Sequence, residues 1–536
     1  MSRMDAALSR RQNRASVATP EAYPAPLGGW VTAQNLAASQ KGTCIVLDNG
    51  YPTTKGVKPR GGNQIYATVG AEPVESLPTY QGAMSSQIFA SSDGSIFPIT
   101  TVVDPDIPPV ALVTSQTSNY YASAQFATSG GYFAYWVNGT DEALLYDGTV
   151  ATPINGVSVP AITGATTSTF SHVNVYRNRL YFVEKNSLVV HYLPVDSIGG
   201  VASQLNLAGI FRKGGAVFFT CTWSSESGSN SLNDYLVVVS TEGELAIFQG
   251  SFPGGTDWTL AGVAEGPEPL GINGWMKAGG DIAILTERGW VAVSAIRVKD
   301  PAALSIDALS SAIEPDWTLE AGRRRTVPWE CLKWETKGLA YVNVPLVSTA
   351  TPPINFVKNL QTGAWGRYTG LDMRCLAIHN NQLFYGSNDG TIRIAEVGGY
   401  DNGVPYTMQM AMSWNHMGAF GTVKTLKQVR GEFLTTYPVA VRMVNFVDYT
   451  INFPSPPNVE GETAPESVYD IGQFDTAIYD GASIQTPKTT YWVTPQGALA
   501  GRVHSTGLQM PIGSPNTPNV EIISLNVTVE QGGLVV

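Results

Sequence analysis

The sequence predicts an all-β protein that combines a β-propeller of about six to seven blades with a second β domain. A strand, turn, strand pattern recurs along the chain at intervals of 45 to 57 residues, which predicts the propeller. Long alternating strands without this spacing follow after about residue 400 and predict the second domain. A chain of 536 residues with 43% hydrophobic content is long enough to form the cores of both.

The repeated unit is clearest between Asn380 and Glu396, where apolar strand formers flank Asp389-Gly390. An Asp-Gly pair in this setting predicts a type I′ hairpin turn. A single hairpin is unstable, but repeated copies can bury their faces against one another. Each interval between turns also holds further short β segments, which favours four-stranded blades over a β-sandwich. The seven predicted turns lie at Gly94, Gly139, Asn186, Gly243, Gly289, Gly338 and Gly390.

Four further segments are predicted between and after these hairpins. Asp300 to Glu314 has the clearest helical pattern, and we expect it to be a helical insertion on one face of the propeller. Val423 to Phe453 and Asn519 to Val536 are expected to be the long strands of the second domain. The acidic, polar stretch around residues 455–487 is expected to be either a surface loop or a protruding contact element.

Residues 1–26 are predicted to be a flexible basic arm, because four arginines precede a Pro/Ala stretch. Such an arm is either a disordered tail or a segment that orders on a partner. No stretch approaches the roughly 18 apolar residues of a membrane span, so we expect no integral membrane segment. The four cysteines lie far apart without a CxxC pair, which favours folding in a cytoplasm with free thiols.

Charge limits the choice of partners. The net charge of −11 disfavours tight binding of nucleic acid or anionic membranes. Charged residues make up only 14% of the chain, against roughly 25% in average domains. Neutral polar surfaces cost less to desolvate than charged ones, so this composition fits either a protein that assembles or simply a turn-rich β protein.

Motifs of catalysis are absent from the sequence: we find no GxSxG, HExxH, P-loop or dinucleotide-binding fingerprint. The five histidines lack metal-ligand spacing, and the Asp-Gly pairs are explained as turns, so no catalytic residue, metal or cofactor is predicted. Asp104 and Asp106 lie in a proline-rich stretch without further ligands. A hydrolase with carboxylates scattered over several blades stays open as an alternative.

The densest basic patch outside the arm is Arg323, Arg324 and Arg325. It is expected to be a solvated loop or, alternatively, a contact with another subunit, a fibre or phosphate groups.

Both ends of the chain resemble the tail nozzle, or tail tubular protein B, of short-tailed bacteriophages, and the related packaged-DNA stabilisation proteins. At the front the resemblance is carried by Gly28 to Gly62, with an early Gly-Gly segment, the strand CIVLDNGYP and the pair Arg60-Gly61. In the last blade it is carried by NLQTGAWGRYTG, and at the back by TLKQVRGEF, NFVDY and VTVEQGG.

This resemblance implies a non-enzymatic virion protein, made in the host bacterial cytoplasm and located in the virion tail. Six copies would form a ring below the portal and the adaptor, through which double-stranded DNA passes with weak contacts, and fibres or spikes would dock around it. It also implies that both chain ends form a platform: residues 27–75 and 406–536, around a propeller of residues 76–405. Asn49, Arg60 and Gly61 are its candidate adaptor-interface residues. The alternative reading is a glycan-binding or glycan-cleaving propeller.

Overall fold

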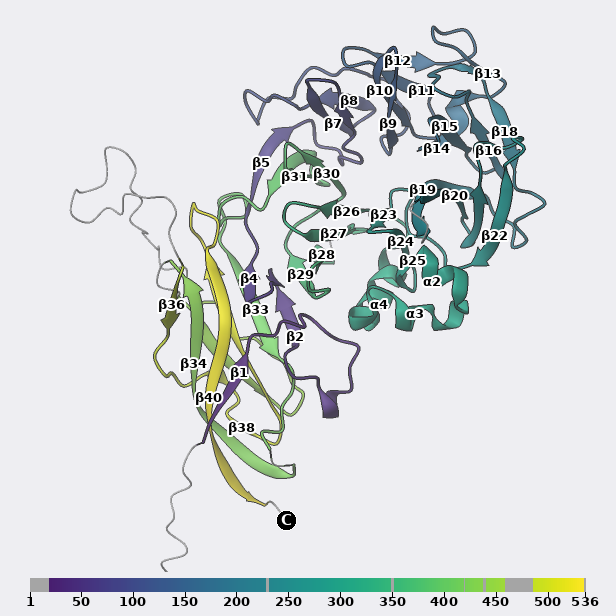
Figure 1. Cartoon of the computed structure of the whole chain (residues 1–536). Coiled ribbons are helices and arrows are strands. Elements are labelled where there is room, and N and C mark those ends of the chain that lie inside the picture. Colours follow the sequence, from purple (N-terminus) through teal and green to yellow (C-terminus); the bar gives the residue numbers. More distant parts are fainter. Residues whose placement is uncertain are drawn as a thin grey trace, which may run out of the picture. The chain divides into compact units, whose positions relative to one another are not determined.

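A computed structural model describes residues 19–227, 231–348, 351–418, 420–436, 440–457 and 485–534 (Figure 1). The chain divides into two compact units. The propeller unit contains Asn63–Leu360 and Tyr368–Val397. The terminal unit contains the described parts of Met1–Gly62, Gln361–Arg367 and Gly398–Val536, so both ends of the chain contribute to it. Strands dominate both units, as the sequence predicts.

Six small separate sheets lie in a ring in the propeller unit and form a β-propeller (Figure 1). Each has three or four antiparallel strands among the described residues. In chain order, five of them are β6(Thr79–Gln81), β7(Ser86–Ser92) and β8(Ser95–Pro98); β9(Ala122–Thr128), β10(Gly131–Val137), β11(Ala143–Tyr146) and β12(Ala151–Ile154); β14(Phe170–Tyr176), β15(Arg179–Glu184), β16(Val189–Tyr192) and β18(Ser203–Asn206); β19(Val217–Ser227), β20(Ser231–Ser240), β21(Glu244–Gln249) and β22(Thr259–Glu265); and β23(Trp275–Ala278), β24(Asp281–Thr286) and β25(Gly289–Ala292).

The sixth sheet closes the ring with strands from opposite ends of the propeller unit. β30(Cys375–His379), β31(Gln382–Gly386) and β32(Thr391–Ala395) are joined by β5(Asn63–Thr68), which pairs antiparallel with β32. β5 lies within residues 27–75, which were predicted to belong to the platform, whereas it is part of the propeller unit. This pairing joins residues more than 300 positions apart, so no local pattern could reveal it.

Three further strands stand in the ring between β23 and β30: β26(Cys331–Trp334), β27(Leu339–Val344) and β28(Ile354–Asn359). They form an antiparallel meander like the other blades and occupy a seventh position. The first strands of several neighbouring blades contact one another, for example β14 with both β9 and β19, and β26 with both β23 and β30. These first strands therefore surround the middle of the ring (Figure 1).

All seven predicted hairpins are present. Six of them join the second and third strands of a blade, and the Gly338 turn joins β26 to β27. The predicted type I′ turn at Asp389-Gly390 is wrong, because only Gly390 has a positive φ, of 76°. Asp389 instead accepts hydrogen bonds from the amide and hydroxyl of Thr391 and stabilises a longer loop.

Apolar clusters between neighbouring blades hold the ring together. Phe126 and Tyr135 of one blade pack with Phe170 and Phe182 of the next. The rings of Phe170 and Phe182 are stacked with centroids 4.6 Å apart. Each such side chain contributes roughly 1.5–3 kcal/mol through burial, so the ring is stabilised blade by blade.

The helical insertion lies between β25 and β26, as predicted, but its helices differ from the prediction. Asp300–Glu314 is not one helix: it contains two 3-10 turns and α3(Leu304–Asp307), because Ala308 is extended. Among the residues that the structure describes, the longest helix is α4(Glu314–Arg324). Its Trp317 is buried and donates to the Thr286 carbonyl at 2.9 Å, which attaches the insertion to its blade. No helix in the described part of the chain is long and apolar enough to span a membrane.

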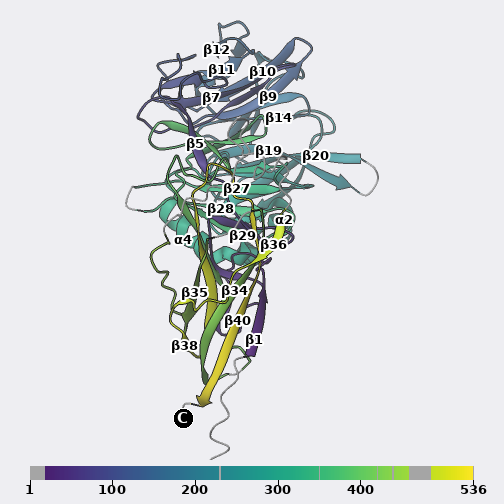
Figure 2. The ribbon, with the colours of Figure 1, turned by 90° about the vertical axis from the view of Figure 1, so that its left-hand side faces the viewer.

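The terminal unit contains two mainly antiparallel sheets. One has β3(Gly50–Pro52), β4(Val57–Pro59), β40(Val520–Leu534), β34(Thr422–Thr435) and β36(Thr486–Thr489), with β38(Ala500–Gly501) on β34. The other contains β2(Cys44–Asp48), β33(Tyr406–Met412), β39(His504–Ile512), β35(Arg442–Val447) and β37(Gln496–Gly497). β34 and β40, the predicted long strands, form the most extended pairing of this unit (Figure 2).

One part of the predicted flexible arm is ordered. β1(Thr19–Pro24) pairs with β40 from Thr19 opposite Val529 to Pro24 opposite Ser524. Its prolines are tolerated because it lies at the edge of the sheet, and Asn415 donates to the hydroxyl of Tyr23 at 2.8 Å. Residues 1–18, and residues 458–484 of the acidic stretch, lie outside the described residues.

Gly390 lies in the loop between β31 and β32 of the last blade and allows this loop to lie close to Gly70, just after β5. A Cβ at Gly390 would lie 2.2 Å from the carbonyl oxygen of Gly70, whereas a Cβ at Gly370, with a similar φ of 82°, would have nothing within 4 Å. We expect Gly370→Ala to cost about 1–2 kcal/mol from backbone strain alone, and Gly390→Ala to cost clearly more. Urea unfolding of both variants measures the difference, and equal losses would contradict this close approach.

Candidate functional site

The three residues that the family resemblance selected meet around one buried guanidinium in the terminal unit. Arg60 is fully buried, and its Nη1 and Nη2 donate to the two carboxylate oxygens of Asp401 at 2.8 and 2.6 Å. Its Nε donates to the Asn49 side chain at 2.9 Å, and Nη1 also donates to the Gly61 carbonyl at 2.9 Å. The guanidinium lies over the ring of Tyr406, 3.9 Å from the centroid.

Asn49 and Tyr406 link this cluster to the surrounding strands. Asn49 has a positive φ of 58°, which asparagine tolerates better than most residues. Its side chain donates to the Thr407 carbonyl at 2.9 Å, and the hydroxyl of Tyr406 donates to the Arg60 carbonyl. The cluster therefore joins the N-terminal segment to β33 within the terminal unit. Its residues act inside the fold, and Arg60 offers no surface to an adaptor.

The three consecutive arginines have different surroundings, because they end α4 instead of forming the predicted loop. Arg324 is buried and donates to Glu320 at 2.7 Å and to the carbonyls of Val344 and Pro352. Arg325 pairs with Glu268 at 2.6 Å. Arg323 lies 3.5 Å from Glu320 with 57% of its side chain exposed, and Arg325 is 51% exposed, so both present part of their charge to solvent.

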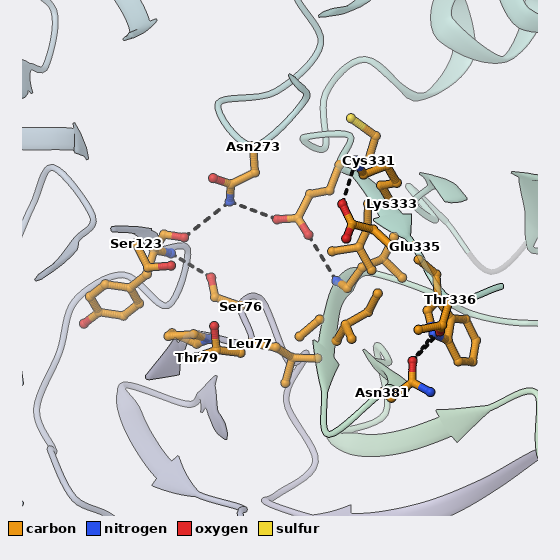
Figure 3. A pocket seen from close by; sticks show the side chains of 18 residues that line it. Ser76, Leu77, Thr79, Ser123, Asn273, Cys331, Lys333, Glu335, Thr336 and Asn381 are labelled. Atoms are coloured by element: carbon orange, nitrogen blue, oxygen red, sulfur yellow. Dashed lines mark hydrogen bonds and ion pairs between the residues drawn. The ribbon is translucent and has the colours of Figure 1, made fainter. Parts of the chain in front are cut away.

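A cavity of about 580 Å³ lies among the first strands of the propeller (Figure 3). Residues from β6, β9, β26 and β30 line it, together with Asn273 just before β23. Such a volume is within the range of small-molecule pockets. Sequence reasoning missed this site, because its residues come from five separate parts of the chain.

A chain of hydrogen bonds crosses one end of this cavity (Figure 3). The Tyr121 amide donates to the Ser76 hydroxyl at 2.7 Å, and the Asn273 side chain donates to the Tyr121 carbonyl at 3.3 Å. The same Asn273 nitrogen donates to the Glu330 carboxylate at 3.1 Å. The Leu376 amide donates to the other carboxylate oxygen, also at 3.1 Å. This chain connects five blades through their innermost segments.

Glu330 is the acidic member of this chain and is only 6% exposed. Burial raises its pKa from 4.5 to about 7, because desolvation outweighs the opposing effects of Asn273, the Leu376 amide and Arg374. The sequence signal is a glutamate between Trp329 and Cys331 at the start of a strand, a position where charge is rare. Among the described residues, no group of three His, Cys, Asp or Glu side chains could hold a metal ion.

No known protein family and no curated protein matches the chain. Among solved structures, it is similar to the computationally designed Ika8 protein, with 7% identity over 62% of this chain and 100% of that one and a TM-score of 0.32. It is also similar to BBS1N in complex with ARL6DN, with 9% identity, coverage of 63% and 95%, and a TM-score of 0.37. YCF48 from Cyanidioschyzon merolae has 9% identity, coverage of 63% and 99%, and a TM-score of 0.35. These scores carry no argument about function.

Arg60 provides the first test of the site. Replacing it with alanine leaves the Asp401 carboxylate and the Asn49 side chain without their main partner, and we expect a loss of about 3–5 kcal/mol. Arg60→Lys should recover only part of this loss, because an ammonium cannot make the two-pronged contact. Arg323→Ala is the control and should change the stability by less than about 0.5 kcal/mol. Urea unfolding measures all three variants; an Arg60→Ala effect as small as that of the control would contradict this role.

Glu330 should make folding stability depend on pH. A glutamate with a raised folded-state pKa stabilises the fold below its unfolded pKa of about 4.3 and loses this contribution as pH rises to about 7, by up to about 3 kcal/mol. Burial lowers the pKa of His172 to about 3, which changes stability in the opposite direction over part of this range. The test is therefore the difference between Glu330→Gln and the unaltered chain.

We expect Glu330→Gln to gain stability relative to the unaltered chain between pH 4.5 and pH 7, measured by urea unfolding at several pH values. Glu335→Gln, at a side chain that is 76% exposed on the same cavity, is the control and should show no such gain. A Glu330→Gln difference that stays constant with pH would contradict the assignment.

Proposed function

We propose that this protein is a non-catalytic structural subunit of a hexameric tail nozzle in a short-tailed bacteriophage virion. Six copies would form the conduit for double-stranded DNA below the portal and the adaptor, help retain the packaged DNA, and offer docking surface to fibres or spikes. One observation carries this proposal: residues from both ends of the chain build a single β unit, and the propeller is inserted between them. The family resemblance implies this same chain order.

The position of the matched residues also supports the proposal. Asn49, Arg60 and Gly61 meet in one buried cluster with Asp401, from the other end of the chain. If the matched residues preserve the shape of a platform, we expect them to join the N-terminal segment to the C-terminal part of the chain. This cluster makes such a contact. Its role in adaptor binding is then indirect, through the fold.

An uncharged region of the propeller supports assembly between copies. No Asp, Glu, Lys or Arg occurs in residues 148–176 or 197–211. β13(Ile162–Thr163) and β17(Gly200–Val201) pair and bring these two segments together. Val157 and Val201 are 90% and 66% exposed there. Because copies with a net charge of −11 repel one another, an uncharged apolar surface is the favourable place for contact.

The glycan-binding or glycan-cleaving propeller is the second candidate. The cavity among the first strands favours it, because its volume of about 580 Å³ is within the range of small-molecule pockets. Such a protein would act as a monomer or small oligomer.

Light scattering across a concentration series, with the same samples imaged in negative stain, tests the nozzle proposal. We expect rings with a mass near six times 57.2 kDa. Val157→Glu with Val201→Glu should shift the samples toward monomer, because charge is placed on the uncharged surface. Val110→Glu, at a valine that is 88% exposed elsewhere on the propeller, is the matched control and should still assemble. A chain that remains at 57.2 kDa at every concentration contradicts self-assembly and favours the glycan alternative.

A further inference from the structure

The cavity among the first strands contains a buried carboxylate that forms no ion pair among the described residues. Glu330 is 6% exposed, and its two oxygens accept hydrogen bonds from neutral donors, the Asn273 side chain and the Leu376 amide. An ionised carboxylate has about four acceptor positions, so two remain open. No ion pair among the described residues includes Glu330. A buried charge of this kind is costly unless it is neutralised or paired.

The charged groups around Glu330 are engaged with other partners. Arg374, beside the cavity, pairs with Glu75 at 2.9 Å. Lys333, on β26, pairs with Glu335 at 2.8 Å. Burial raises the pKa of Cys331 and Cys375 and of the Tyr120 hydroxyl, so these groups stay neutral near pH 7 and supply no positive charge.

One part of the cavity wall suits an alkyl chain. Leu77, Leu332, Leu376 and Ile378 line it, and the volume is about 580 Å³ (Figure 3). Polar side chains such as Ser123, Thr336 and Asn381 line the same cavity, so its wall is mixed, and small-molecule sites commonly combine apolar contact with a few polar groups. The wall would contact methylene groups while the carboxylate receives a polar head.

We propose that this cavity binds a primary alkylammonium group, with its nitrogen donating to the Glu330 carboxylate and its methylene groups against the leucines of the wall. An ammonium has three donors on a compact head, which fits a carboxylate that already accepts two hydrogen bonds. A divalent metal ion fits poorly, because calcium takes six to eight oxygen ligands and no cluster of three ligating side chains occurs among the described residues. The ammonium belongs either to a free alkylamine or to a lysine side chain of a partner.

Titration of the full chain with n-butylammonium at pH 8, followed by calorimetry, tests this proposal, and n-butanol serves as the neutral probe of equal length. We expect the amine to bind at least about tenfold more tightly than the alcohol. Glu330→Gln should weaken amine binding by a similar factor and leave alcohol binding unchanged. Thr336→Ala, at an exposed residue that lines the same cavity and leaves the pair of Lys333 with Glu335 intact, is the control and should bind the amine as the unaltered chain does.

The pH dependence tests the same site without any variant. Because the ammonium pairs with the ionised carboxylate, we expect binding by the unaltered chain to weaken between pH 8 and pH 5.5. Nα-acetyl-lysine-methylamide distinguishes the two sources: binding supports a lysine side chain as the ligand, and binding of butylammonium alone supports a free amine. No saturable binding of butylammonium, equal affinity for the alcohol, or an unchanged affinity in Glu330→Gln would overturn the proposal.

Discussion

The propeller depends on one non-local pairing, that of β5 with β32. Every other blade of the ring is built from strands that follow one another in the chain, so each can form locally. The last blade needs β5 from the start of the propeller unit, and five pairs of residues, from Thr391 with Thr68 to Ala395 with Asn63, close the ring. No disulfide assists, because all four cysteines are free and buried. Closure therefore depends on hydrogen bonds and packing alone.

The two chain segments that flank this pairing stay together in the terminal unit. The Gly62 amide donates to the Gly398 carbonyl at 2.8 Å, and a Cβ at Gly62 would lie 2.1 Å from the carbonyl oxygen of Tyr400. Beside them, Arg60 pairs with Asp401. A buried ion pair adds little net stability compared with apolar packing, but removing one partner is strongly unfavourable. This pair therefore acts mainly by excluding other arrangements of the two segments.

The parts of the fold that could be predicted are those that local sequence determines. The seven hairpins follow from turn residues such as Gly94 and Gly243 between short apolar strands, and all seven form. β5 was assigned to the other domain because its partner strand is distant in sequence. β1 was assigned to a flexible arm because its six residues contain two prolines, and its partner β40 lies at the other end of the chain. Tertiary pairing overrode the local signal in both cases.

The candidate site shows the same limit at the level of side chains. The resemblance selected Asn49, Arg60 and Gly61, and the structure brings all three together around a buried guanidinium, an internal contact that the motif alone could not indicate. In the basic patch, helix α4 turns Arg324 inward to Glu320, which the charge pattern alone could not indicate. Glu330 was missed because a single buried carboxylate has no motif, and its surroundings come from distant blades.

The propeller's own middle is not a path for DNA, and this constrains the proposed conduit. Hydrogen bonds through Tyr121, Asn273 and Glu330 cross one end of the cavity, which has only about 580 Å³ of space. A DNA duplex is far too wide for it, because its major groove alone is about 12 Å across. In a ring of six copies the lumen must therefore lie between subunits and be lined by their outer surfaces.

Every phosphate neutralised in such a lumen would add salt-dependent affinity that must be broken as DNA leaves. A chain with a net charge of −11 and few exposed basic clusters makes such contacts weak, so the low charge density would serve subunit contact and DNA passage together.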